Sequence, residues 1–195
     1  MMSAASEQFA GLPPLQRAYL ALEEMQLKLD ALERARTEPI AIIGIGCRFP
    51  GGADGLERFW HLLRDGVDTV SEVPPERWDV NAFYDPDPAR PGKTYSRWGS
   101  FLSQVDQFDP YFFGISPREA AVMDPQQRLL LEVAWEALEN AGLPADSLAG
   151  SQTGVFVGIY NSDYARLQQE DDAYSAIGNS LGVASGRLSY VFDFL

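Results

Sequence analysis

The composition of the chain changes abruptly near Thr37, and this change limits what the chain can fold into. Before that point Ala, Leu, Glu and Gln prevail, whereas Gly, Pro and aromatic residues appear throughout the remainder. The first composition is typical of a long helix and the second of a mixed globular domain. The 195 residues therefore predict two units, a helical segment over residues 1–36 and a larger domain over residues 38–195.

Apolar residues in the first unit repeat with the period of a coiled coil. Leucines recur every seven positions and each is followed, three positions later, by another apolar residue; the six are Leu15, Ala18, Leu22, Met25, Leu29 and Leu32. This pattern predicts a seam that joins two copies of the helix. Lys28 and Glu33 then fall at g and e positions, where opposite charges meet across a parallel dimer.

Leu20 and Leu27 form a second apolar stripe, at positions that face water in a plain two-stranded coil. Phe9 and Leu12 precede a Pro-Pro pair, where the chain can turn and lay a short first helix along the longer one. We interpret the first unit as a small dimeric docking element with a groove for a helix from another protein. The alternative is a single amphipathic helix that packs on its own domain.

The second unit contains two short apolar runs that predict buried strands. They cover residues 39–44 and 153–158, and each is flanked by Gly or Pro. Between them, residues 74–100 form a long Pro-rich loop that carries five aromatic residues. So many aromatic side chains predict an ordered loop pinned to the surface.

Three helices are predicted in the same unit. The first begins at a cap formed by Asp54 and ends at Gly66, and the second begins at Asp124 and ends at Gly142. A third helix is expected over about 176–191, with glycines at every fourth position that allow another backbone to approach closely. A strand followed by a helix begins an α/β layer.

Charge and residue counts exclude several classes of partner and site. Fifteen Lys and Arg face 28 Asp and Glu, a formal net charge of −13 that repels phosphate backbones, so we expect no nucleic-acid partner. The single cysteine and single histidine exclude an intrachain disulfide and a zinc site of several Cys or His ligands. With no signal peptide or spanning segment visible, we expect a cytoplasmic protein that does not enter a membrane.

Two patterns that could suggest catalysis have little support. Gly44-Ile45-Gly46 follows a predicted strand, but Phe49 stands where a dinucleotide fingerprint needs its third glycine, and Pro50 follows. Cys47 and His61 are a conceivable nucleophile and base, although nothing in their spacing brings them together. A small buried hydrophobe is the commoner role for such a cysteine.

Acidic residues gather after the second predicted strand. Asp163, Glu170, Asp171 and Asp172 are potential cation ligands, but runs of this kind are usually solvated loops. We therefore predict no metal ligand, no cofactor-binding residue and no catalytic residue among the 195 positions.

Several blocks of the second unit resemble the ketosynthase domain of modular type I polyketide synthases. In order along the chain they are residues 38–52, 108–120, 123–128, 135–139, 153–158 and 184–190. The leading helix, from Leu15 to Leu20, is similar to the N-terminal docking segments of such synthases, in a less specific way.

The resemblance implies an α/β architecture: an incomplete thiolase-like (condensing enzyme) fold preceded by an α-helical coiled-coil docking segment. It also implies a homodimer that catalyses decarboxylative Claisen condensation of acyl and malonyl-type thioesters. These substrates are tethered through phosphopantetheine to acyl carrier protein, and no cofactor is bound directly. The implied partners are a second copy of the chain, acyl carrier protein and the C-terminal docking tail of an upstream synthase polypeptide.

The catalytic residues of the family do not match positions in this chain. The family nucleophile lies in an Asp-Thr-Ala-Cys-Ser-Ser motif shortly after the segment matched by residues 190–193, and the chain stops at Leu195. Cys47 and His61 match neither that nucleophile nor the two family histidines. We therefore expect a ketosynthase truncated before its catalytic cysteine; the alternatives are a non-catalytic docking or interaction protein and one half of a split ketosynthase.

Overall fold

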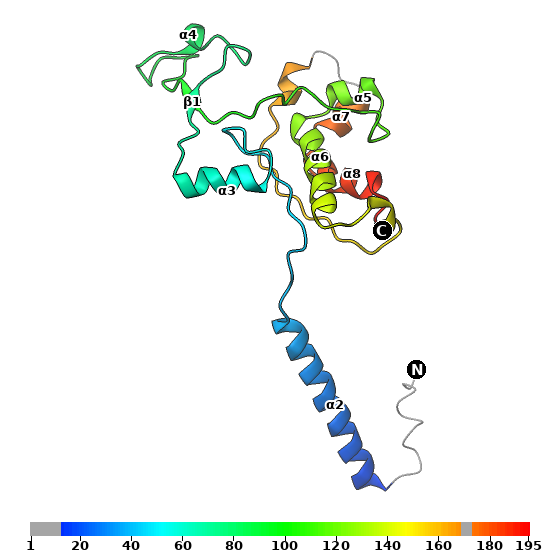
Figure 1. The fold of residues 1–195 in the computed structure, drawn as a ribbon. Helices are drawn as coiled ribbons and strands as arrows, with labels where there is room; N and C mark the ends of the chain where they lie inside the picture. Colours follow the sequence, from blue (N-terminus) through cyan, green and yellow to red (C-terminus); the bar gives the residue numbers. More distant parts are fainter. Residues whose placement is uncertain (1–12, 169–172) are drawn as a thin grey trace. The chain divides into compact units, whose positions relative to one another are not determined.

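A computed structural model describes residues 13–168 and 173–195, which form two compact units that divide between Ile42 and Ile43 (Figure 1). The short first helix expected around Phe9 and Leu12 lies outside the described residues. In that described part, no helix has the length and apolar character needed to cross a membrane.

Helix α2 (Pro14–Thr37) accounts for most of the first unit. Proline at its first position is preorganised for a helix and gives up an N–H that has no partner there. Arg34 and Arg36 lie in its last turn, where positive charge interacts favourably with the helix dipole. The backbone leaves the helix at Glu38 because Pro39 disfavours a helical conformation in the residue before it.

Helix α3 (Leu56–Asp65) opens the second unit and ends as its sequence predicts. Gly66 adopts φ +61°, and the backbone N–H groups of the cap bond to the carbonyls of Leu62 and Leu63. The predicted N-cap is wrong. Gly55 occupies that position and no side chain caps the helix, while Asp54 instead faces Arg58 at 3.9 Å.

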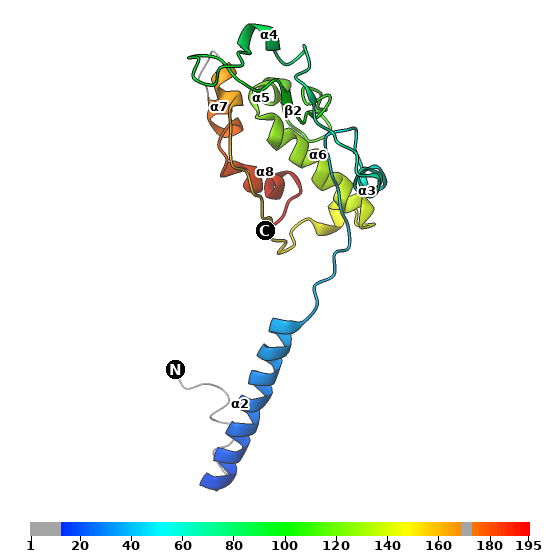
Figure 2. The same cartoon turned by 90° about the vertical axis from the view of Figure 1, so that its left-hand side faces the viewer.

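Helix α6 (Pro125–Asn140) forms the centre of the second unit, with α5 (Pro117–Val122), α7 (Ala173–Gly178) and α8 (Val183–Val191) around it in both views (Figures 1 and 2). Its predicted cap is confirmed, since the Asp124 side chain accepts a hydrogen bond from the Gln126 N–H at 2.8 Å. Met123 and Leu131 are fully buried beside Leu188.

The long helix expected over 176–191 is interrupted, so that prediction is wrong. Residues 179–182 separate α7 from α8. The Gly178 carbonyl, which would bond to the N–H of residue 182 in a continuous α-helix, accepts instead from the Asp124 N–H and from the Gln127 side chain. A β-carbon on Gly178 would lie 3.0 Å from the Val122 carbonyl oxygen, so a close backbone approach exists at this glycine. A β-carbon on Gly182 or on Gly186 would meet nothing within 4 Å.

Neither apolar run predicted as a strand forms one. The described sheet consists of β1 (Ser71–Glu72) and β2 (Trp98–Gly99), paired antiparallel. A strand requires a hydrogen-bonded neighbour, and no backbone-to-backbone bond links residues 39–46 or 152–160 to another described residue. Burial alternates along 151–160 as in a half-buried strand, leaving Phe156 and Tyr160 almost wholly exposed.

The Pro-rich loop is ordered, as predicted. Within it α4 (Val80–Phe83) is capped by Asp79, whose carboxylate accepts from the Asn81 N–H at 3.0 Å. Thr94 donates its N–H to the Phe83 carbonyl at 2.8 Å, closing the loop. Two 3-10 helices, Ala145–Leu148 and Tyr164–Leu167, complete the described elements.

Candidate functional site

The residues predicted to form the coiled-coil seam lie on the surface of α2. Its large members are exposed by between 51% at Leu29 and 82% at Leu15, and Ala18 is exposed as well. In the second stripe Leu27 is exposed and Leu20 is half-buried. An exposed apolar stripe on one helix is what a docking or dimer surface requires, but the seam itself stays a prediction.

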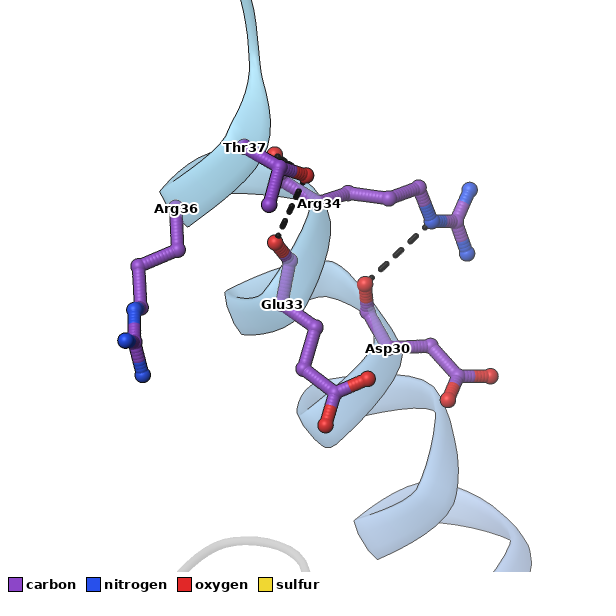
Figure 3. A pocket seen from close by; sticks show the side chains of 5 residues that line it. All are labelled: Asp30, Glu33, Arg34, Arg36 and Thr37. Atoms are coloured by element: carbon purple, nitrogen blue, oxygen red, sulfur yellow. Dashed lines mark hydrogen bonds between the residues drawn. The ribbon is translucent and has the colours of Figure 1, made fainter.

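A shallow pocket lies at the C-terminal end of α2, lined by Asp30, Glu33, Arg34, Arg36 and Thr37 (Figure 3). Arg34 Nε donates to the Asp30 carbonyl at 3.2 Å. The Thr37 hydroxyl lies 3.1 Å from the Glu33 carbonyl oxygen and 3.3 Å from that of Arg34. Of these three carbonyls only that of Arg34 is among the last four of the helix, which have no intrahelical partner. The pocket is lined by side chains of the last two turns of α2, and these hydrogen bonds go to the backbone of the helix itself.

Cys47 and His61 have separate environments. The cysteine is buried, whereas His61 lies exposed on α3 with its Nδ1 2.9 Å from an Arg64 guanidinium nitrogen. No hydrogen bond joins the two side chains in the part of the chain that the structure describes. Among those residues no group of three or more potential metal ligands gathers either. Glu170, Asp171 and Asp172 lie outside the described residues.

The glycines before Cys47 allow the segment 43–48 to lie directly on α6. A β-carbon on Gly44 would stand 2.3 Å from the Ala137 carbonyl oxygen, and one on Gly46 would stand 2.3 Å from that of Val133. Gly44-Ile45-Gly46 thus has a packing role, consistent with rejecting a dinucleotide fingerprint. The Ile45 N–H also donates to the Asn140 side chain at 3.0 Å.

Arg48 fastens the end of this segment to α6 by a bidentate ion pair with Glu136. The hydrogen bonds to that carboxylate raise the pKa of Arg48. Glu132 lies one turn earlier on α6 and is half-buried. Burial raises its pKa and the Glu136 charge acts in the same direction, against the opposing effect of Arg48.

We expect Glu132→Gln to stabilise α6 at pH 7. A carboxyl whose pKa is raised by folding makes the folded state less stable as the pH rises through that pKa, and glutamine removes this penalty. The gain is below about 1 kcal/mol because the site is partly solvated, and it shrinks as the pH falls toward the ordinary glutamate pKa. Hydrogen exchange of the α6 amides, corrected for intrinsic pH dependence, measures it.

Glu139→Gln, at an exposed position of the same helix, is the control, and the exchange protection of the α6 amides should stay that of the wild type. Reduced protection of α6 in Glu132→Gln at pH 7 would contradict the assigned environment of this carboxyl.

A second polar group lies buried between the helices of the unit. We call Glu119 on α5, Gln127 on α6 and Arg187 on α8 the Arg187 network. Arg187 Nε donates to Gln127 Oε1 at 2.8 Å, and Nη1 donates to Glu119 Oε1 at 2.5 Å. Arg187 and Gln127 are exposed by only 9% and 3%. A buried cation of this kind requires such partners.

Gln127 extends the network to the break between α7 and α8. Its Nε2 donates to the Gly178 carbonyl at 2.8 Å and lies 3.2 Å from the Ser180 carbonyl oxygen. The nearby Asp124 carboxylate accepts from Gln126 and, at 2.8 Å, from the Ser162 hydroxyl. The cluster therefore holds α5, α6, α8 and the α7–α8 break in one arrangement.

Sequence reasoning missed this cluster. Arg187 stands between Ala184 and Leu188, both buried on the same helix, and Gln127 and Arg128 precede the fully buried Leu131. The available signal was the presence of polar residues inside an apolar stripe. The partners of Arg187, however, lie 60 and 68 positions away in the sequence, and no local pattern predicts such pairings.

Comparison with known proteins identifies the family. The family model described as "Beta-ketoacyl synthase, N-terminal domain" matches residues 37–195. The chain belongs to this family, and its second unit corresponds to the N-terminal part of a condensing-enzyme domain.

Within that family, its relatives are polyketide synthases. The chain is 51% identical to one component of the phenolphthiocerol/phthiocerol polyketide synthase of Mycobacterium tuberculosis, over 97% of this chain and 11% of the relative. It is 50% identical to another component of the same synthase, over 98% of this chain and 12% of the relative. The chain thus spans about a tenth of the length of these relatives.

Solved ketosynthase domains share its fold. The oxazolomycin ketosynthase domain OzmH KS7 of Streptomyces albus JA3453 superposes with a TM-score of 0.68 at 42% identity, covering 78% of this chain and 27% of that one. The ketosynthase of module 6 of the bacillaene synthase from Bacillus subtilis 168 gives 0.69 at 34% identity, covering 80% and 25%. The fold is therefore that of part of a thiolase-like ketosynthase domain.

Proposed function

We propose that residues 38–195 supply the N-terminal part of a ketosynthase domain in a polyketide synthase. The enzyme they belong to would catalyse decarboxylative Claisen condensation of an acyl thioester with a malonyl-type thioester. The observation that carries the proposal is the family match over 37–195, in a chain that also superposes on a ketosynthase domain at 42% identity. No residue among the 195 is proposed to be catalytic.

The chemistry of the proposed reaction defines which groups the helices of the second unit would hold in place. The acylated cysteine is a thioester that holds the acyl group. Decarboxylation of the extender releases CO2 and generates an enolate, whose carbon attacks the carbonyl of this thioester and displaces the cysteine thiolate. Both substrates are proposed to arrive on phosphopantetheine arms of acyl carrier protein. The reaction needs an activated thiol and donors that stabilise the enolate and oxyanion, and the packed helices of the second unit would support that site.

We propose further that residues 1–36 form a dimeric docking element. The seam Leu15, Ala18, Leu22, Met25, Leu29 and Leu32 would join two copies, and Leu20 with Leu27 would receive the C-terminal tail of an upstream synthase polypeptide. The exposure of the large seam residues on α2 supports this proposal. It also favours a second candidate function, that of a non-catalytic docking protein.

One assay separates the two functions. The native polypeptide that carries residues 1–195 is incubated with an acyl thioester and then with malonyl-loaded acyl carrier protein. We expect a covalent acyl adduct on a cysteine other than Cys47, followed by a β-ketoacyl product on the carrier protein. Tight binding of an upstream tail without any adduct would favour the docking protein instead.

A further inference from the structure

Arg128 on α6 is a buried cation to which the described residues offer no counter-ion. It is exposed by only 8%, close to the 9% of Arg187. The charge of Arg187 is matched by Glu119. Within residues 13–168 and 173–195, by contrast, no carboxylate oxygen lies within 4.0 Å of an Arg128 side-chain nitrogen, and its buried Nε has no acceptor. A buried charge without an opposite charge strongly destabilises a folded protein.

The immediate neighbours of Arg128 do not compensate its charge. The Arg128 Cζ lies 5.7 Å from the centroid of the Tyr164 ring, which is fixed by a 2.7 Å hydrogen bond from its hydroxyl to the Ala121 carbonyl. An aromatic face attracts a guanidinium but leaves its in-plane N–H donors unused. One turn earlier, the Asp124 carboxylate is engaged by the first turn of α6 and by a serine hydroxyl. Glu132, one turn later, forms no ion pair with Arg128.

The segment that leads to Tyr164 also lacks partners. Residues 152–160 form no backbone-to-backbone hydrogen bond with another described residue. Val155 and Val157 pack against the core, whereas Phe156 and Tyr160 are each 97% exposed. Unpaired backbone groups and large exposed apolar side chains mark a surface that further chain covers. The solved OzmH domain has such further chain, since residues matched here cover only 27% of it.

We infer that Arg128 binds a carboxylate, from an aspartate or glutamate carried by the same polypeptide beyond residue 195. A guanidinium presents a planar fork of N–H donors that a carboxylate matches in a bidentate pair, and the Tyr164 ring supports it from one side. The inference rests on the proposed function, in which a larger ketosynthase domain supplies this further chain. The ion pair fixes where that chain packs against α6.

The first test uses Arg128→Lys in the native polypeptide. A carbodiimide joins a lysine amine to a carboxylate without a spacer, so only groups in contact are coupled. We expect mass spectrometry of the digest to find position 128 linked to an aspartate or glutamate beyond residue 195. Mixed 15N-labelled and unlabelled copies should show that the link lies within one chain. Arg187→Lys is the positive control and should link to Glu119.

No link in Arg128→Lys, under conditions where Arg187→Lys links to Glu119, would overturn the inference. A link to a carboxylate among residues 1–195, or to one in the second copy, would overturn it as well.

Arg128→Met decides the matter if Arg128→Lys does not fold. In hydrogen exchange of the native polypeptide, one segment beyond residue 195 should lose protection by at least about 10-fold, because its carboxylate is left without a partner. Arg36→Met, at an exposed position of α2, should leave that segment unchanged. Wild-type exchange throughout the further chain in Arg128→Met would overturn the inference alone. A native polypeptide without the rest of a ketosynthase domain would overturn the proposed function with it.

Discussion

Gly46→Ala is expected to release the segment 43–48 from α6. The added β-carbon would lie 2.3 Å from the Val133 carbonyl oxygen and 3.1 Å from the Ala137 nitrogen, where ordinary contacts begin at 3.4 Å. Both atoms belong to the helix backbone and have little freedom to move. The segment must retreat by about 1 Å, which strains the Arg48–Glu136 pair and the bond from Ile45 to Asn140.

Overpacking against a backbone in this way should cost about 3 kcal/mol. In hydrogen exchange of the native polypeptide, the Ile45 amide, which is bonded to Asn140, and the amides of α6 should then exchange about 100-fold faster. Gly186→Ala is the matched control, because a β-carbon there meets nothing within 4 Å. As an alanine inside a helix, it should stabilise α8 by up to about 1 kcal/mol. Equal protection of α6 in Gly46→Ala and wild type would refute the close approach.

Leu22→Asp should abolish dimerisation of a peptide comprising residues 1–36. In the proposed seam each copy would bury a carboxylate against apolar side chains, which costs several kcal/mol per dimer. The same substitution at Leu29 should have the same effect. Sedimentation equilibrium gives the association state, and we expect the dimer dissociation constant to rise by at least about 100-fold.

The control for the seam is Leu27→Asp, which places the same charge on the second stripe of the same helix. That peptide should remain dimeric while losing affinity for an upstream docking tail. A dimer that persists in Leu22→Asp would exclude the seam as assigned, and a wild-type peptide that is monomeric would favour the single amphipathic helix.

Local signals in the sequence predicted α2, α6 and the end of α3, although the helix expected over 176–191 proved to be two. The heptad pattern and the change in composition near Thr37 predicted α2, and the Asp124 cap with Gly142 predicted α6 almost residue by residue. These signals work because the interactions that start and stop a helix lie within a few positions of each other. Gly66 marked the end of α3 for the same reason.

Features that depend on distant residues were not predictable in this way. Residues 39–44 and 153–158 have the composition of strands, but a strand exists only when a neighbour pairs with it. At the break between α7 and α8 the Gly178 carbonyl is bonded to Gln127, 51 positions earlier in the chain. The reaction could not be predicted from the spacing of residue types either. It was inferred from blocks of sequence that resemble a family, and the family model then matched residues 37–195.

The mass of the native polypeptide shows whether these residues belong to a polyketide synthase ketosynthase. An antibody against residues 1–36 captures it from source cells, and mass spectrometry maps its peptides. We expect a polypeptide far longer than 195 residues, with peptides from a complete ketosynthase domain that include an acylatable cysteine. A polypeptide whose mass corresponds to 195 residues, with no second chain that supplies this cysteine, would refute this assignment.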